Sequence, residues 1–315
     1  AYTIKKFGVV NRYDLSKEFP ILTLRRTALK SATDEMLWIW QRKSNNIHDL
    51  NSHVWDEWAD ENGSIGKAYG YQMGVKHQYK EGMMDQVDRV IYDLKNNPFS
   101  RRIMTNIYVH QDLHEMNLYP CAYSMTFNVT QKKGEDRLTL NAVLNQRSQD
   151  VLAANNWNVV QYSVLVHMLA QVCDMNVGEL VHVIADAHIY DRHVDAIKEL
   201  INREPYPAPK FWLNPEIRDF YRFTPDDVKL EGYQTGEQIK DIPIAIGGVT
   251  VNPGDIIVAD GDGVIVVPRK IAKDVAKYAH KELYSDKEKR KEKFETLGWE
   301  LNDSVINNQK VYTGN

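Results

Sequence analysis

The chain has 315 residues, 43% hydrophobic and 26% charged, which is the composition of a globular protein with one large domain or two. Its formal net charge of −4 excludes a global attraction to nucleic-acid polymers or anionic membranes, although local basic groups could bind a nucleotide. No apolar run reaches the roughly 20 residues of a membrane helix and no signal-peptide pattern opens the chain, so we expect a cytoplasmic protein without a membrane partner.

Strands and helices alternate in the pattern over most of the chain. Residues 1–13 predict a strand, and 29–41 predict an amphipathic helix because apolar residues recur there every three or four positions. An aromatic, glycine-rich loop follows at 54–74. Further helices are predicted at 85–95, 158–173 and 191–201, and further strands at 103–109, 123–130, 137–144, 179–186 and 210–213. This alternation indicates an α/β or α+β sheet protein.

The character of the sequence changes after residues 241–246. Residues 247–268 predict three short β runs, separated by Pro-Gly-Asp and Asp-Gly-Asp-Gly turns. A helix and a charged stretch at 281–295 follow. We therefore place a domain boundary near 246 and expect a small β-rich extension with a charged helical tail at 247–315.

Two cysteines are too few for a disulfide framework, so in a reducing cytosol each is either buried filler or a reactive thiol. Cys121 follows Pro120, whose fixed φ stiffens the backbone at the thiol. A nucleophilic cysteine also needs a nearby cation or base, which spacing alone cannot show. Cys173 belongs to a predicted apolar helix and is expected to be a buried packing residue.

Two clusters contain the residue types that bind phosphate. Arg147 stands between Gln146 and Ser148 after a predicted strand, and an arginine fork with neutral donors suits a phosphate group. Arg101 and Arg102 form a second basic pair. From the residues alone, the first cluster could also be a solvated turn and the second an ordinary surface pair.

Histidines and aromatic residues offer other possibilities. His182, His188 and His193 lie close in sequence, but no metal-binding spacing accompanies them, so we expect no metal. His188 and Tyr190 face one side of an extended segment and could hold a sugar hydroxyl. No phosphate-binding glycine motif of the P-loop or dinucleotide type is present.

Tryptophans that lie in loop-like, polar sequence are a further indication of a binding site for a flat ring. Trp55, Trp58 and Trp157 could be core residues, or they could stack on a flat ring.

Eight motifs, in this order, resemble folate-dependent thymidylate synthase, and particularly its clostridia-like branch. They cover residues 1–246 and read FPILTLRRT, WDEWADENGSIGKAYG, NNPFSRR, YPCAYS, QRSQD, WNVVQYSVL, DAHIYDRH and REPYPAPK. The resemblance implies a thymidylate synthase-like catalytic domain at 1–246. Its fold would be α+β (α/β layered), a large mixed β-sheet flanked by helices.

The resemblance also implies the reaction, reductive methylation of dUMP to dTMP (EC 2.1.1.45). Cys121 matches the nucleophile that attacks C6 of the uracil ring. The co-substrate 5,10-methylenetetrahydrofolate would supply both the one-carbon unit and the hydride, so neither NAD nor a metal is required. Glu35 matches the acid/base residue near O4, and Tyr69 matches the tyrosine implicated in removing the C5 proton.

Matching positions imply the ligands of both substrates. The Asn158 amide would donate to O4 and accept from N3–H, which favours uracil over cytosine. The full dUMP set implied is Arg147, Ser148, Gln146, Asn158, His188 and Tyr190, completed by Arg101 and Arg102 from the other subunit of a homodimer. The folate set implied is Asp150, Trp55, Trp58, Trp157 and Ala154, with Asp150 bonding the pterin ring.

Some positions depart from the family pattern. Ala122 stands where many members have histidine, and Ala153-Ala154 replace a Leu-Gly pair. We expect an N-terminal truncation, because the family's first helix and arginine loop have no counterpart. Residues 247–298 resemble the last third of the RraA-like family, which implies a fused, non-catalytic fragment.

Two other functions compete with the synthase. A dUMP or dCMP hydroxymethylase would quench the same intermediate with water instead of hydride. An inactive assembly module would act through its tail, for example on a ribonuclease.

Overall fold

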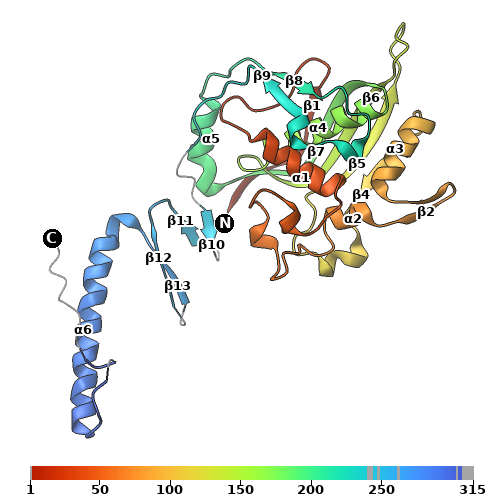
Figure 1. The fold of residues 1–315 in the computed structure, drawn as a ribbon. Coiled ribbons are helices and arrows are strands. Elements are labelled where there is room, and N and C mark those ends of the chain that lie inside the picture. Colours follow the sequence, from red (N-terminus) through yellow and green to blue (C-terminus); the bar gives the residue numbers. More distant parts are fainter. Residues whose placement is uncertain (1, 240–243, 247–248, 261–262, 303, 307–315) are drawn as a thin grey trace. The chain divides into compact units, whose positions relative to one another are not determined.

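A five-stranded mixed sheet forms the centre of the structure, a computed structural model that describes residues 2–239, 244–246, 249–260, 263–302 and 304–306 (Figure 1). The strand order is β1 (Thr3–Asp14), β7 (Asn176–Tyr190), β6 (Thr139–Asp150), β5 (Ala122–Thr130) and β4 (Met104–Asn106). β6 and β7 are parallel, whereas the other neighbours are antiparallel. A parallel pair needs a crossover connection, and helix α4 (Asn155–Val172) provides it.

Helix α4 packs against β6 and β7, and helix α1 (Leu29–Trp40) packs against α4. Both helices are buried over most of their length, which explains their apolar composition. Polar residues on these helices, Glu35 and Asn158 among them, are the exceptions to that composition, and such exceptions in a buried helix need a partner or a function.

Smaller elements surround this core. They are the helices α2 (Gly70–Gly74), α3 (Gln86–Asn96) and α5 (Val194–Ile201), the hairpins β2 (His77–Tyr79) with β3 (Gly82–Met84) and β8 (Lys210–Leu213) with β9 (Val228–Glu231), and short 3-10 helices at Ile47–Asp49, Asp56–Trp58, His110–Glu115, Asp191–His193, Phe220–Arg222 and Pro225–Asp227.

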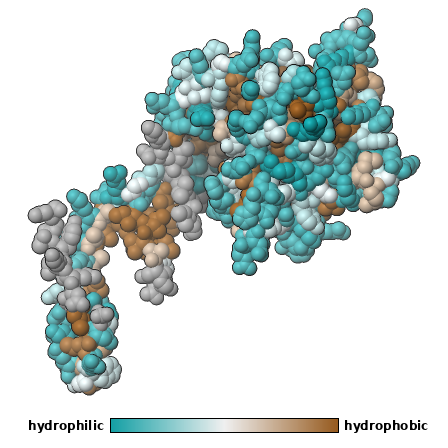
Figure 2. Space-filling view, in the orientation of Figure 1, coloured by the Kyte–Doolittle hydropathy of each residue, from teal (hydrophilic) through white to brown (hydrophobic). Residues whose placement is uncertain are grey.

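The chain divides into two compact units, Tyr2–Ile239 and the described part of Lys240–Asn315. The second unit contains the antiparallel pairs β10 (Ile244–Ile246) with β11 (Val249–Val251) and β12 (Ile256–Asp260) with β13 (Gly263–Val267), a 3-10 helix at Arg269–Ile271 and helix α6 (Ala272–Thr296). The β12–β13 hairpin exposes apolar side chains, visible as a brown patch in Figure 2: Ile256, Ile257, Val258, Val264 and Ile265.

Most predicted elements are confirmed, with revised bounds. The strand predicted to end at 144 continues to Asp150, so Arg147 lies within β6 and not in a turn after it. Likewise β7 extends to Tyr190, and the strand predicted at 103–109 is reduced to β4. The hairpin β2–β3 and strand β9 were not predicted. The boundary expected near 246 adjoins 247–248, which lie outside the described residues, and it stays a prediction.

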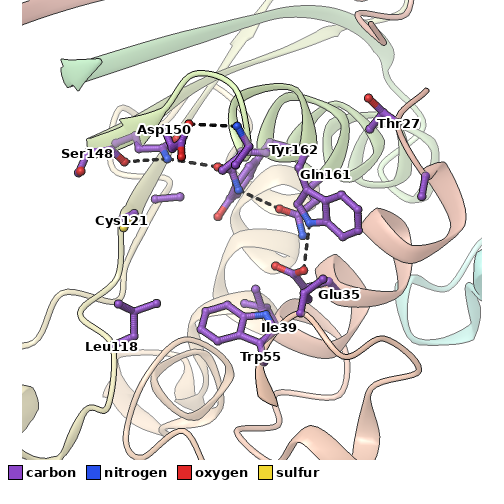
Figure 3. Close-up of a pocket in the computed structure, with 18 of the residues that line it drawn as sticks. Thr27, Glu35, Ile39, Trp55, Leu118, Cys121, Ser148, Asp150, Gln161 and Tyr162 are labelled. Atoms are coloured by element: carbon purple, nitrogen blue, oxygen red, sulfur yellow. Dashed lines mark hydrogen bonds between the residues drawn. The ribbon is translucent and has the colours of Figure 1, made fainter. Parts of the chain in front are cut away.

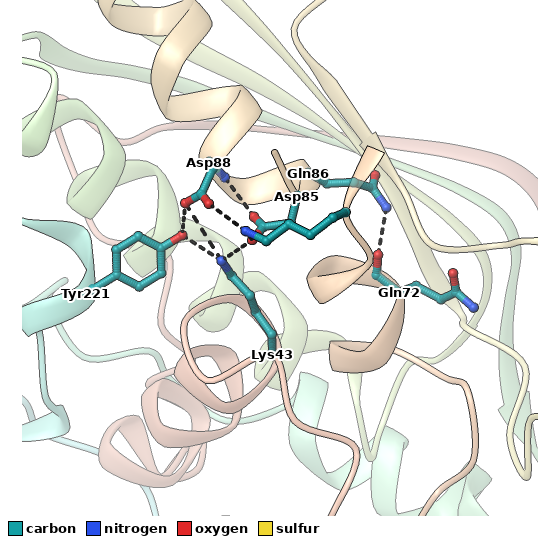
Figure 4. A network of polar contacts seen from close by, with 7 residues as sticks. Lys43, Gln72, Asp85, Gln86, Asp88 and Tyr221 are labelled. Atoms are coloured by element: carbon teal, nitrogen blue, oxygen red, sulfur yellow. Dashed lines mark hydrogen bonds and ion pairs between the residues drawn. The ribbon is translucent and has the colours of Figure 1, made fainter. Parts of the chain in front are cut away.

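A cluster of charges fixes the end of α1 (Figure 4). The Lys43 ammonium lies 2.6 Å from the buried Asp85 carboxylate and 2.8 Å from the Tyr221 hydroxyl, and Lys76 contacts Asp85 at 2.7 Å. The next residue, Ser44, packs so closely on Gly70 that a Cβ there would lie 2.0 Å from the Ser44 carbonyl oxygen. This network therefore holds the loop that precedes α2.

Gly66 makes a second close approach in the same loop. Its φ is +75°, and a Cβ would lie 2.0 Å from the Glu115 carbonyl oxygen. Only glycine tolerates both the left-handed backbone and the missing space.

We expect Gly66→Ala to destabilise the chain by about 2–4 kcal/mol, because left-handed strain and a backbone clash add together. Gly134→Ala is the matched control, since Gly134 has φ +85° but nothing within 4 Å of a Cβ, and it should cost about 1 kcal/mol. Urea unfolding of both variants measures the difference. Equal losses would show that the approach to Glu115 is unimportant.

Candidate active site

A cavity of about 700 Å³ opens between α1, α4, the ends of β6 and β7, and the loop before α2 (Figure 3). A volume of this size is in the range of small-molecule sites. The predicted site residues that line it are Cys121, Glu35, Tyr69, Gln146, Ser148, Asn158, His188, Tyr190, Asp150, Trp55, Trp58, Trp157 and Ala154.

Cys121 lies directly before β5, where the pairing with β6 is irregular between Ala122 and Ser124. Its backbone N–H donates to the Tyr69 hydroxyl oxygen at 3.1 Å. The Arg147 guanidinium donates to the Cys121 sulfur at 3.7 Å and to the carbonyl oxygen of Pro120 at 3.0 Å. The thiol is therefore half-buried at the cavity wall, with a cation beside it.

Burial raises the pKa of the Cys121 thiol, and the Arg147 cation opposes this rise. Burial outweighs it, however, so the net pKa lies above the ordinary value of a cysteine. The thiol is therefore mostly protonated near neutral pH.

Tyr69 has a strained backbone, with φ +43° and ψ −102° at the start of α2. A non-glycine residue in such a conformation costs on the order of 1–3 kcal/mol and persists only where its surroundings enforce it. Burial raises the pKa of its hydroxyl well above the ordinary value, so the phenol stays protonated. Gly66 and Gly70 on either side allow the close packing that enforces this geometry.

Glu35 projects from α1 into the cavity and is buried. Burial raises the pKa of its carboxyl to about 6, although the neighbouring Gln161 and Trp157 side chains moderate the rise. The Trp157 indole N–H donates to Oε2 at 3.0 Å. A carboxyl with this pKa can either hold or release a proton near neutral pH.

The amides of Gln146 and Asn158 meet at the base of the cavity. Gln146 Nε2 donates to Asn158 Oδ1 at 3.2 Å, and Asn158 Nδ2 donates to Gln161 Oε1 at 3.1 Å. Strand β6 supplies the first residue and helix α4 the other two. The crossover between β6 and β7 therefore builds this polar surface.

The carboxyl ends of β6 and β7 hold the remaining predicted groups. Asp150 Oδ1 accepts the backbone N–H groups of Leu152 and Ala153, both at 3.0 Å, which shapes the turn into α4. The rings of His188 and Tyr190 lie edge to face, with centroids 5.3 Å apart, and both residues line the cavity.

Three predicted arginines do not line the main cavity. Arg147 lines a neighbouring cavity of about 340 Å³ with Asn106, Tyr108, His110 and Tyr123, and reaches the main cavity through its contact with Cys121. Arg101 and Arg102 lie exposed in the turn after α3, away from both cavities.

Sequence reasoning missed several lining residues. Gln161 follows Asn158 by three positions and so shares its helix face, a signal that was available. Arg25 and Arg26 form a basic pair within a quoted motif, yet no local pattern placed them at the cavity. Tyr162 was missed because a tyrosine within an apolar helix pattern is typical of a core residue.

Among the described residues, no cluster of three or more His, Cys, Asp or Glu side chains could hold a metal ion. In the same part of the chain, no helix is long and apolar enough to cross a membrane.

Comparison with known proteins identifies the family. The thymidylate synthase family model matches residues 1–246. The chain belongs to the thymidylate synthase family. Thymidylate synthase of Bacillus subtilis subsp. natto is 44% identical over 243 residues, which cover 76% of this chain and 85% of that protein. The enzyme of Bacillus phage phi3T has the same identity and coverage.

A solved structure agrees with the sequence comparison. The thermostable thymidylate synthase A from Bacillus subtilis superposes with a TM-score of 0.70 at 43% identity, covering 75% of this chain and 84% of that one. The fold is thymidylate synthase-like, a mixed sheet with flanking helices, and the activity is thymidylate synthase, EC 2.1.1.45. Members of this family use methylenetetrahydrofolate.

We expect Glu35→Gln to remove a pH-dependent decrease in the free energy of unfolding of this thymidylate synthase. Because the folded pKa is about 6 and the ordinary value is 4.5, the native state binds more protons than the unfolded state between these pH values. The free energy of unfolding should thus fall by about 2 kcal/mol as pH rises through this window, and the variant should not show that loss.

Urea unfolding at pH 4 and 7.5 tests this expectation on the difference between parent and variant. Glu216→Gln makes the same chemical change at an exposed position and should leave the difference independent of pH. A pH-independent difference for Glu35→Gln would contradict the raised pKa.

We expect Arg147→Ala to slow alkylation of Cys121 by iodoacetamide roughly 10-fold at neutral pH, since loss of the adjacent cation raises the thiol pKa further. The pH profile of the alkylation rate should move to higher pH. Arg137→Ala removes an exposed arginine that pairs with Asp174 and should leave the profile unchanged. A profile that is identical in both variants would contradict the role of Arg147.

Proposed function

We propose that this thymidylate synthase works through a covalent bond between the Cys121 sulfur and C6 of dUMP. The observation that carries this proposal is the position of the half-buried thiol at the cavity wall, with the Arg147 guanidinium 3.7 Å away. Addition of the thiolate to C6 makes C5 a nucleophilic, enolate-like carbon. The arginine favours the thiolate in a place where burial disfavours it.

Bound 5,10-methylenetetrahydrofolate would supply the one-carbon unit to C5 and then the hydride that completes the methyl group. The cavity wall suits a flat, polar ring system, because Trp55, Trp58 and Trp157 present aromatic surface and Asp150 an acceptor. Ala154, directly before α4, also lines the cavity, and its small side chain leaves room for the folate. These residues would orient the folate against C5.

Glu35 and Tyr69 would manage the protons. The carboxyl pKa of about 6 lets Glu35 share a proton with O4 as charge develops there. Tyr69 keeps its phenolic proton, so it would act in C5 deprotonation by holding water, not as a direct base. Its strained backbone suggests that this placement matters for function.

Asn158 would read the pyrimidine edge, while Ser148, Arg147, His188 and Tyr190 would hold the phosphate and the deoxyribose. Gln146 supports Asn158 through the hydrogen bond described above. Ser148, His188 and Tyr190 share the cavity at the ends of β6 and β7.

Arg101 and Arg102 would complete the phosphate site from a second subunit. Their exposed position, away from both cavities of their own chain, supports a homodimer in which each subunit lends this pair to its partner. The clostridia-like branch, the cytoplasmic location and the RraA-like origin of 247–298 are further parts of the proposal that stay predictions.

Cys121→Ser should lower the formation of dTMP from dUMP and methylenetetrahydrofolate by on the order of 10³-fold or more, since serine is a far weaker nucleophile at C6. Dihydrofolate absorbance and chromatography of the nucleotide product measure this turnover. Cys173→Ser is the matched control and should retain activity, because that thiol lies at the end of α4, away from the cavity.

The same assay separates the rival functions. Dihydrofolate and dTMP in equal amounts support the synthase, hydroxymethyl product without dihydrofolate supports the hydroxymethylase, and no product supports the inactive module. Turnover retained in Cys121→Ser would overturn the covalent mechanism.

A further inference from the structure

We propose that His182, which has no part in the reaction above, is a positioning residue that fixes the Asn158 amide through Gln146 and so sets the preference for uracil over cytosine. The inference deepens the proposed function and rests on it, because it assumes that Asn158 reads the pyrimidine edge.

His182 is fully buried on β7, and burial lowers the pKa of its imidazole to about 4. It is therefore neutral near pH 7, with one nitrogen that donates and one that accepts. Its Nε2 lies 2.8 Å from Oε1 of Gln146. Because an amide oxygen only accepts, Nε2 must carry the proton, and Nδ1 has no hydrogen-bond partner among the described residues.

The direction of the Gln146 amide is fixed at its other end as well. Gln146 Nε2 donates to the Ser148 carbonyl oxygen at 3.0 Å, and a carbonyl cannot donate in return. The histidine and the carbonyl thus enforce one orientation, with the amide oxygen toward His182. The second N–H of Gln146 is then directed to Asn158 Oδ1, at 3.2 Å.

The orientation of the Gln146 amide determines the orientation of the Asn158 amide. Its Oδ1 accepts from Gln146, and its Nδ2 donates to Gln161 Oε1 at 3.1 Å. One lone pair on Oδ1 and one N–H on Nδ2 remain for a ligand, and Asn158 lines the cavity. An acceptor beside a donor is the pattern that complements N3–H and O4 of uracil, whereas cytosine needs the reverse.

Without the histidine donor, the buried Gln146 oxygen would lose its partner, and the Ser148 carbonyl alone would oppose rotation of that amide. A rotated Gln146 would direct its oxygen at Asn158 and favour the rotated Asn158 amide too. The edge presented to the pyrimidine would then fit cytosine better and uracil worse. The two amides therefore act as one unit whose direction His182 helps to set.

The test is His182→Phe, which keeps a buried ring but removes the donor. We expect kcat/KM for dUMP to fall about 10-fold, and the ratio of dUMP to dCMP affinity, measured by calorimetry, to fall by a similar factor. His182→Gln places an amide N–H near the former Nε2 and should restore most of the ratio. Thermal unfolding of each variant verifies that it folds.

His167→Phe is the matched control. Burial lowers the pKa of His167 to about 4 as well, but its ring packs against Phe211 and Phe19, with centroids 4.3 and 6.1 Å away, and its Nε2 has no hydrogen-bond partner within the described chain. The same substitution there should leave the affinity ratio unchanged.

Asn158→Asp distinguishes failure of this inference from failure of the proposed function. If Asn158→Asp shifts preference toward dCMP while His182→Phe and His182→Gln leave the ratio at the parent value, His182 has no positioning role and the proposed function stands. If Asn158→Asp leaves the ratio unchanged, Asn158 does not read the edge, and the assignment of that residue fails together with this inference.

Discussion

The parallel pairing of β6 with β7 is the constraint on which the site depends. Its register sets Ser148 beside Asp186 and Asp150 beside His188, so two polar strand ends meet at one edge of the sheet. A parallel pair cannot be closed by a hairpin and requires a crossover. Helix α4 makes that crossover and begins at the same edge, which brings Trp157 to the cavity. The residues proposed to bind phosphate, sugar, base and folate are thereby gathered around one strand–helix–strand unit.

Burial governs the chemistry at this edge. It raises the pKa of the Cys121 thiol and of the Glu35 carboxyl, so both groups are held closer to their neutral forms than in water. The Arg147 cation, beside the sulfur, is the main opposing influence on the thiol. Ground-state protonation with an adjacent cation suits a nucleophile that is needed only when a substrate fills the cavity. The strained Tyr69 backbone is enforced by the close packing at Gly66 and Gly70 on either side of it.

The sequence predicted the helices well because their apolar residues follow a clear period, as at 29–41. The strands predicted for β6 and β7 ended too early, because the residues at their carboxyl ends follow no clear period. Gln146, Ser148 and Asp150 are polar and face the main cavity, so they break the pattern by which a strand is recognised. The contact between Cys121 and Arg147 was beyond local reasoning, since it arises from the pairing of β5 with β6, which sets Ala122 opposite Gln146. From the sequence, only the family resemblance carried by the eight ordered motifs placed Cys121 and Arg147 in one site.

The neutral character of the surface proposed to read the pyrimidine follows from the same burial. Glu35 and Cys121 already resist ionisation in this cavity, and a further charge close by would move both pKa values. Amides and an uncharged histidine can specify donors and acceptors by direction alone. The chain from His182 through Gln146 to Asn158 would therefore select a base without disturbing the thiol, and Arg147 remains the cation that tunes it. Recognition of the ring and activation of the nucleophile would in this way be assigned to separate groups.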